Sequence, residues 1–142
     1  MASGLPDYLK VVRPRYGGAK YVAWQKQAQA NQDTTMGEVE GKGVIYGGSI
    51  LCVYTSTQKN SLPKIIIDGV ELVSASFYSM IYYGIIAKKA APFYLMKYND
   101  ADFIYGAGIL PGITFESSVV VKYGERNGAT PTLVGWIVYA LL

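Results

Sequence analysis

From Gly43 onward, the chain is a series of short runs of β-branched and aromatic residues, separated by Gly, Pro, Asn or Asp. Runs of this composition favour strands, and the residues between them favour tight turns. The runs are Ile45, 49–55, 64–67, 70–73, 77–86, 93–98, 113–123 and 132–141. Seven or eight short strands predict an all-β fold, an antiparallel β-sandwich or jelly roll, with a barrel-like variant as the alternative.

Two of these runs also predict how their strands relate. Residues 113–123 alternate apolar and polar side chains, which is typical of a strand with one buried face. Residues 132–141 are apolar on both faces, which predicts a central strand that is the most buried of all. Asn127-Gly128 lies between the two runs and predicts a turn that makes them antiparallel neighbours.

The middle of the chain contains one clear turn and one ambiguous segment. Asp68-Gly69 predicts a β-hairpin, because a type I′ turn needs positive φ at both central positions. Residues 74–87 fit one helical turn followed by a strand, and Gly84 disfavours a long helix there.

Residues 1–42 differ from the rest of the chain, because Pro6, Pro14 and Gly17-Gly18 interrupt regular structure and 25–35 is a polar tract. We therefore predict an extended N-terminal arm over 1–42 and a β-sandwich domain over 43–142. The arm is either a partly disordered tail or a segment that orders on a partner. Interfaces are enriched in aromatic and Arg side chains, so the predicted partner-binding residues are Tyr8, Arg13, Arg15, Tyr16, Tyr21 and Trp24. Removal of residues 1–26 is then expected to leave a folded domain.

The composition excludes most familiar active sites, because the chain has no His and a single Cys, Cys52. Catalytic arrangements built on His, zinc sites built on Cys and His, and intrachain disulfides are all ruled out. Glu71 and Glu116 are candidates for a catalytic carboxylate pair, but both fall on the predicted solvent face of strands. We therefore expect no enzymatic activity, no cofactor and no metal, and we expect Cys52 to be a core residue.

Three further groups of residues are candidates for binding. Asn99, Asp100 and Asp102 carry the oxygen ligands that Ca²⁺ prefers, but no full calcium loop follows, so a polar turn is expected. The glycines of 106–108 lack the spacing of a nucleotide-binding loop and are expected in a flexible connection. A tyrosine cluster either stacks on sugar rings or forms an intersubunit contact, and the absence of Trp within it favours the contact. Its members are Tyr78, Tyr82, Tyr83, Tyr94, Tyr98 and Tyr105.

The charge pattern bears on partners and location. The net charge is +3, and the basic residues form no run that would neutralise phosphates, so no nucleic acid partner is expected. No stretch reaches the roughly 20 apolar residues that a membrane-spanning helix needs, so no membrane partner is expected either. Nothing near residue 1 has the form of a secretion signal, and a lone cysteine fits synthesis in a reducing cytoplasm.

Three short patterns between residues 48 and 142 carry a resemblance to a known family. They are Lys97, Tyr98 and Asp100 before a polar loop; Pro111, Gly112, Ile113, Phe115 and Ser118 at the start of a strand; and Val138 with Tyr139 in the closing strand. In these patterns the chain resembles the small β-sandwich virion proteins of tailed bacteriophages. The resemblance covers about two thirds of the chain, and it does not extend to the N-terminal arm or to residues 64–80.

The resemblance implies a structural role in a virus particle. A protein of this family would decorate or stabilise the capsid surface, usually as a homotrimer, with the major capsid protein as its partner. The arm would then reach across neighbouring subunits. A head fibre or tail component that binds a receptor or a carbohydrate is the alternative that the resemblance leaves open.

Overall fold

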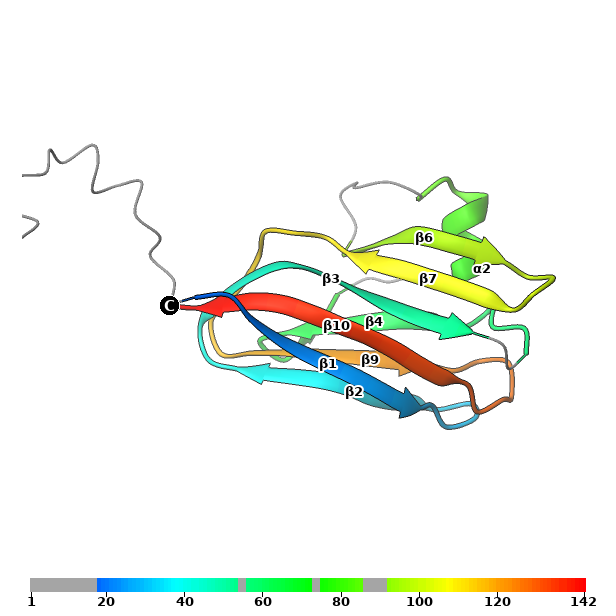
Figure 1. The fold of residues 1–142 in the computed structure, drawn as a ribbon, viewed down its shortest axis with the longest axis horizontal. Helices are drawn as coiled ribbons and strands as arrows, with labels where there is room; N and C mark the ends of the chain where they lie inside the picture. The colour runs from blue at the N-terminus through cyan, green and yellow to red at the C-terminus, as the bar shows by residue number, and fades with distance from the viewer. Residues whose placement is uncertain (1–17, 54–55, 73–74, 86–91) are drawn as a thin grey trace, which may run out of the picture.

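The computed structural model describes residues 18–142 except 54–55, 73–74 and 86–91. Two antiparallel sheets lie one over the other and form the predicted β-sandwich (Figure 1). The six-stranded sheet has the order β1 (Lys20–Gln27), β10 (Thr132–Leu141), β3 (Gly43–Val53), β7 (Ile104–Ile109) and β6 (Phe93–Asn99), with β8 (Ile113–Phe115) also paired to β3. The four-stranded sheet has the order β2 (Asp33–Glu40), β9 (Ser118–Gly124), β4 (Leu62–Ile67) and β5 (Val70–Glu71).

The core lies between the two sheets, because every second side chain of a strand points inward. Ile50 and Leu133 from the six-stranded sheet meet Ile65 and Val121 from the four-stranded sheet, and all four are fully buried. Burial of each such side chain stabilises the fold by roughly 1.5–3 kcal/mol. Cys52 is fully buried among them, which confirms its predicted place in the core.

The predicted boundary of the arm at residue 42 is wrong. Residues 20–27 pair with β10 along their whole length, and residues 33–40 pair with β9. Both are edge strands, and an edge strand needs only a few inward apolar side chains to join a sandwich. Trp24, Met36 and Val39 supply them and are buried. The sandwich therefore includes residues 20–40, and the rest of the predicted arm, residues 1–17, lies outside the described residues.

The run 113–123 forms two strands instead of one, because the chain changes sheets within it. Residues 113–115 form β8 in the six-stranded sheet, and residues 118–124 form β9 in the four-stranded sheet. The predicted alternation is confirmed in β9, where Val119, Val121 and Tyr123 are buried. Asn127-Gly128 consequently connects two strands in opposite sheets, so β9 and β10 are not the antiparallel neighbours that this turn signal predicted.

The last strand, β10, is central but is not the most buried. It has strand neighbours on both sides, β1 and β3, as predicted. Its side chains alternate between the core and an open face, and Trp136 on that face is 42% exposed. In β7, by contrast, every residue after Ile104 is buried. The apolar residues on the outer face of β10 are thus uncovered by the described residues of this chain.

Of the predictions for the middle of the chain, the hairpin is confirmed and the helix-then-strand segment is confirmed only in part. Asp68 and Gly69 have φ values of 52° and 81°, and Ile67 pairs with Val70, which confirms the hairpin. Residues 77–82 form a helix, α2 (Phe77–Tyr82), and not a strand, so the single helical turn is the part of that prediction that holds. The Ser76 hydroxyl caps this helix by accepting the Ser79 N–H at 3.1 Å.

Candidate interaction surface

The outer face of the six-stranded sheet is built from side chains that the strand registers align in rows. Facing residues of neighbouring strands point to the same side of the sheet, so each row crosses several strands. The middle row contains Ala23, Trp136, Ser49, Gly108 and Tyr94. The rows beside it contain Gln25, Val134, Leu51, Gly106 and Lys97, and Tyr21, Val138 and Gly47. Lys97 is the only charged residue in these three rows, which we call the apolar face.

The outer face of the four-stranded sheet has a different composition. Its aligned positions include charged residues of both signs, namely Glu38, Glu71, Lys64 and Lys122, together with Thr35, Val120 and Ile66. Antiparallel sheets that face water on one side normally carry such polar residues there. The two outer faces of one molecule therefore differ, and only the four-stranded sheet has the usual composition of a solvent face.

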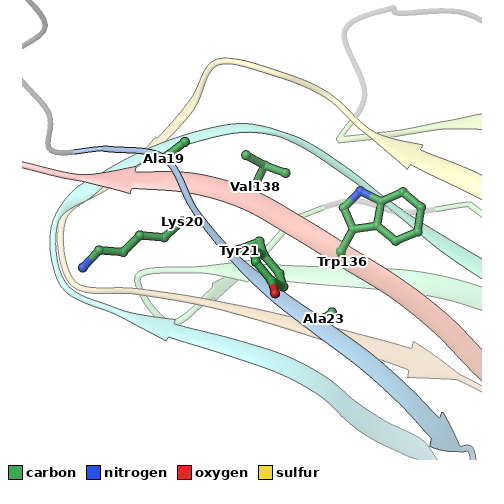
Figure 2. A pocket seen from close by; sticks show the side chains of 6 residues that line it. All are labelled: Ala19, Lys20, Tyr21, Ala23, Trp136 and Val138. Atoms are coloured by element: carbon green, nitrogen blue, oxygen red, sulfur yellow. The ribbon is translucent and has the colours of Figure 1, made fainter.

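A shallow hollow of about 350 Å³ lies on the apolar face over β1 and β10. Its lining residues are Ala19, Lys20, Tyr21, Ala23, Trp136 and Val138 (Figure 2). Tyr21 is 74% exposed and Trp136 is 42% exposed. Tyr and Trp are the side chains that contribute most often to protein interfaces, because each combines a large apolar area with one polar group.

The glycines of β7 shape the other side of the apolar face. Gly106 and Gly108 lie in a buried strand and not in the flexible connection that the sequence predicted. A Cβ atom on Gly108 would collide with the Tyr94 ring, and one on Gly106 would meet Leu51 Cδ2 at 3.0 Å. The absence of side chains here lets both neighbouring side chains lie flat on the sheet.

The predicted tyrosine cluster separates into different environments. Tyr105 is fully buried, and Tyr98 meets it edge-on with ring centroids 5.5 Å apart. On α2, Tyr78 and Tyr82 stack with centroids 6.1 Å apart, and Tyr83 lies edge-on to Tyr82 at 5.1 Å. These three are 48%, 70% and 72% exposed. They form a second exposed patch on α2 and its C-cap residue Tyr83, which we call the α2 tyrosines.

The structure describes two of the six predicted partner-binding residues, and they lie in opposite environments. Tyr21 is exposed in the hollow. Trp24 is 8% exposed, so its assignment to a partner-binding arm is wrong. Its indole ring lies against Gly37 of β2 and Gly135 of β10, where added Cβ atoms would meet the ring at 3.0 and 2.6 Å. The other four, Tyr8, Arg13, Arg15 and Tyr16, lie outside the described residues.

Sequence reasoning missed Trp136, because it read the last strand as buried on both faces. The signal that could have located it is that β10 carries two alternating sets of apolar side chains, one on each face. The set with Leu133 and Ile137 is buried, and the set with Trp136 and Val138 lines the hollow. One sandwich can cover only one of these sets.

A buried carboxylate, Glu125, connects three loops at one end of the sandwich. Its Oε1 accepts the backbone N–H groups of Asn31 at 3.0 Å and Gly128 at 2.8 Å. Its Oε2 accepts the Gln58 side chain at 2.8 Å and the Asn127 N–H at 3.0 Å. Burial raises the pKa of Glu125, but these hydrogen bonds outweigh burial and hold it below its usual range. These four hydrogen bonds hold the three loops together, which is a structural role.

The other acidic candidates are also engaged within the chain. Asp100 accepts hydrogen bonds from the hydroxyls of Tyr105 and Thr57, and Asn99 bonds to Asp102, so this segment is the predicted polar turn. Glu71 lies 3.4 Å from Lys64 Nζ, and Glu116 lies 3.2 Å from Lys42 Nζ, and the side chains of both glutamates are exposed. Neither glutamate has the burial that a catalytic carboxyl requires.

Cys52 and the possible metal ligands among the described residues also provide no reactive site. Burial raises the pKa of Cys52 to about 12, so its thiol is protonated at neutral pH. Within the described ranges, no three His, Cys, Asp or Glu side chains are grouped as metal ligands. In that same part of the chain, no helix has the length and apolar character needed to span a membrane.

No protein-family model matches the chain, and no curated protein matches it.

Proposed function

We propose that this protein is a non-enzymatic structural protein that assembles by burying its apolar face against other protein subunits. The observation that supports the proposal is the contrast between the two outer faces, one charged and one nearly free of charge. Water favours charged residues on a free sheet face, whereas a subunit interface favours the residues of the hollow. Truncation of a Trp or Tyr at the centre of an interface commonly weakens binding by about 2 kcal/mol or more.

In its specific form, the proposal is a capsid decoration or stabilisation protein of a tailed bacteriophage. The resemblance in residues 48–142 supports this form, with a homotrimer as the oligomer and the major capsid protein as the partner. The composition is in keeping with it, because only 16% of the residues are charged and 13 are Tyr. With so few charged side chains, little of the protein surface is suited to contact with water alone.

Light scattering of the full-length protein over a range of concentrations tests the assembly. We expect an oligomer, and we expect Trp136→Ala to convert it to monomers. Ile66→Ala, on the outer face of the four-stranded sheet, is the matched control and should leave the mass unchanged. A wild-type protein that stays monomeric up to about 100 µM would contradict the proposal.

The virion form needs a separate test, because other assemblies would also bury the apolar face. Mass spectrometry of virus particles purified from cells that carry the gene should detect the chain in amounts comparable to the major capsid protein. Purified particles that lack the chain would exclude the decoration role and leave the assembly proposal to the scattering result.

The α2 tyrosines support a second candidate, a carbohydrate-binding module of a head fibre or tail. Sugar rings stack on exposed aromatic rings, and three such rings lie together on α2 and its C-cap residue. A glycan array probed with the wild-type protein and with Tyr82→Ala/Tyr83→Ala tests it. Binding that the double variant loses would favour this module, and an array without signal would remove it.

A further inference from the structure

We propose that the α2 tyrosines of one copy occupy the hollow on the apolar face of a second copy, so that the copies join head to tail. The inference rests on the proposed function, because it specifies what covers the hollow when the protein assembles.

The hollow and the α2 tyrosines lie at opposite edges of the six-stranded sheet. The hollow lies over β1 and β10, and β1 is the first strand in the order of that sheet. The last strand is β6, and α2 lies beside it (Figure 1). Directly after the helix, the Ile85 carbonyl accepts the N–H of Leu95 in β6 at 2.7 Å. Four strand spacings of about 4.8 Å separate β1 from β6, so the tyrosines do not reach the hollow of their own chain.

A concave surface requires a protruding partner, which a second hollow does not supply. Two hollows that face each other would leave a void, and atoms that line a void lose packing contacts. Such a two-fold contact would also bring Lys20 of both copies to one apolar surface, where like charges repel. The occupant of the hollow is therefore a different part of the partner.

The α2 tyrosines have the exposure and the composition that this occupant needs. Among the described residues, they are the one group of exposed aromatic rings that contact one another. Tyr82 and Tyr83 are more exposed than every other large apolar side chain of the described chain except Tyr21. The helix itself contains no charged residue, so the group brings no charge to the apolar face.

The size of the hollow matches two of these rings. An apolar cavity of about 150 Å³ holds one benzene ring. The hollow measures about 350 Å³. Tyr82 and Tyr83 lie edge-on with ring centroids 5.1 Å apart, so the two rings enter as one unit. Tyr21 and Trp136 in the wall of the hollow then pack against them, and aromatic rings prefer such aromatic neighbours.

Lys20 gives the hollow a polar group that suits tyrosine. It lines the hollow (Figure 2), and it forms no ion pair with another described residue. An ammonium group donates hydrogen bonds, and a tyrosine hydroxyl accepts them. The ammonium is also attracted to the face of an aromatic ring. Buried tyrosine rings can thus keep a hydrogen-bond partner for a hydroxyl without any acidic residue in the contact.

A contact between two different surfaces repeats from copy to copy. Each copy offers a hollow at one edge and the α2 tyrosines at the other, so a second copy still has a free surface for a third. Heterologous contacts of this kind close into a ring when the rotation between copies allows it. The homotrimer of the proposed function is such a ring, and it covers every hollow and every α2 tyrosine group at once.

Removal of the two most exposed rings, read by light scattering of the full-length protein, tests the inference. Tyr82→Ala/Tyr83→Ala should weaken self-association at least about thirtyfold, the effect of losing one energetically dominant interface residue. Tyr82→Phe/Tyr83→Phe keeps both rings and should remain assembled. Val70→Ala removes an exposed apolar side chain from the β4–β5 hairpin of the other sheet and should have no effect. Circular dichroism of each variant confirms that it is folded.

A mixture of two variants separates the head-to-tail contact from a symmetric one. Trp136→Ala removes a wall of the hollow and keeps the tyrosines, and Tyr82→Ala/Tyr83→Ala keeps the hollow and removes the rings. Each variant alone should be a monomer of 15.5 kDa. Their equimolar mixture should form a pair of twice that mass and nothing larger, because only one intact hollow and one intact tyrosine group are present.

The outcomes distinguish this inference from the proposed function. A mixture that stays monomeric up to about 100 µM would overturn the head-to-tail contact. If Trp136→Ala dissociates the protein and Tyr82→Ala/Tyr83→Ala leaves it assembled, this inference fails and the proposed function stands. A monomeric wild type would refute both.

Discussion

Replacement of Glu125 by Ala is expected to cost about 3 kcal/mol of the free energy of unfolding. The change leaves four hydrogen-bond donors without their acceptor, those of Asn31, Gln58, Asn127 and Gly128. Each unpaired buried donor costs about 1–3 kcal/mol. The Gln58 side chain bears the full cost because it is buried, whereas the exposed Asn31 and Gly128 recover part of theirs from water. Roughly 3 kcal/mol corresponds to a fall of about 10 °C in Tm for a chain of this length.

Urea denaturation followed by far-ultraviolet circular dichroism measures this loss. Glu116→Ala is the matched control, because it removes a carboxylate from an ion pair whose side chains are 54% and 74% exposed. Its effect should stay within about 0.5 kcal/mol. If Glu125→Ala unfolds within about 1 kcal/mol of the wild type, the three loops are not held together through this carboxylate and the reasoning is wrong.

Three further predictions follow from the fold. Backbone N–H groups of 116–118 donate to Asp68 and lower its pKa from 3.8 to about 2. The contribution of Asp68 to stability is therefore full above pH 3.8 and is lost as the pH falls to about 2. Asp68→Asn should remove this dependence from Tm values measured between pH 2 and 6. Removal of residues 1–17 should leave Tm unchanged, whereas removal of 1–27 takes away β1 and Trp24 and should cost at least about 3 kcal/mol in urea denaturation. Cys52 should react with a thiol reagent at neutral pH only after unfolding, and rapid labelling of the native protein would contradict its burial.

The features of the fold that local chemistry determines could be predicted from the sequence. The runs of β-branched residues located most strands, and Asp68-Gly69 located a hairpin because its two φ values depend only on the turn itself. Asn127-Gly128 predicted a turn, but it did not predict that the strands before and after the turn lie in opposite sheets. A turn signal does not say whether the next strand stays in the same sheet, and that choice is made by packing between the sheets.

The candidate site was predicted less well than the fold, for a physical reason. A strand that is apolar on both faces has the same sequence pattern whether its second face is covered by its own chain or by a partner. Trp136 was therefore assigned to the core, although it lies on the apolar face. In β1 the error was the opposite, because Gln and Lys residues around Trp24 obscured a strand that only one large inward side chain anchors.

The two tryptophans of this chain occupy opposite sides of the same sheet, and each is therefore a separate optical reporter. Trp24 lies in the core and Trp136 in the hollow, and the sequence contains no third. The emission of Trp24 should change when the chain unfolds, and that of Trp136 should change when the apolar face is covered. Intrinsic fluorescence of Trp136→Phe and Trp24→Phe variants can thus follow folding and assembly independently, without an added dye.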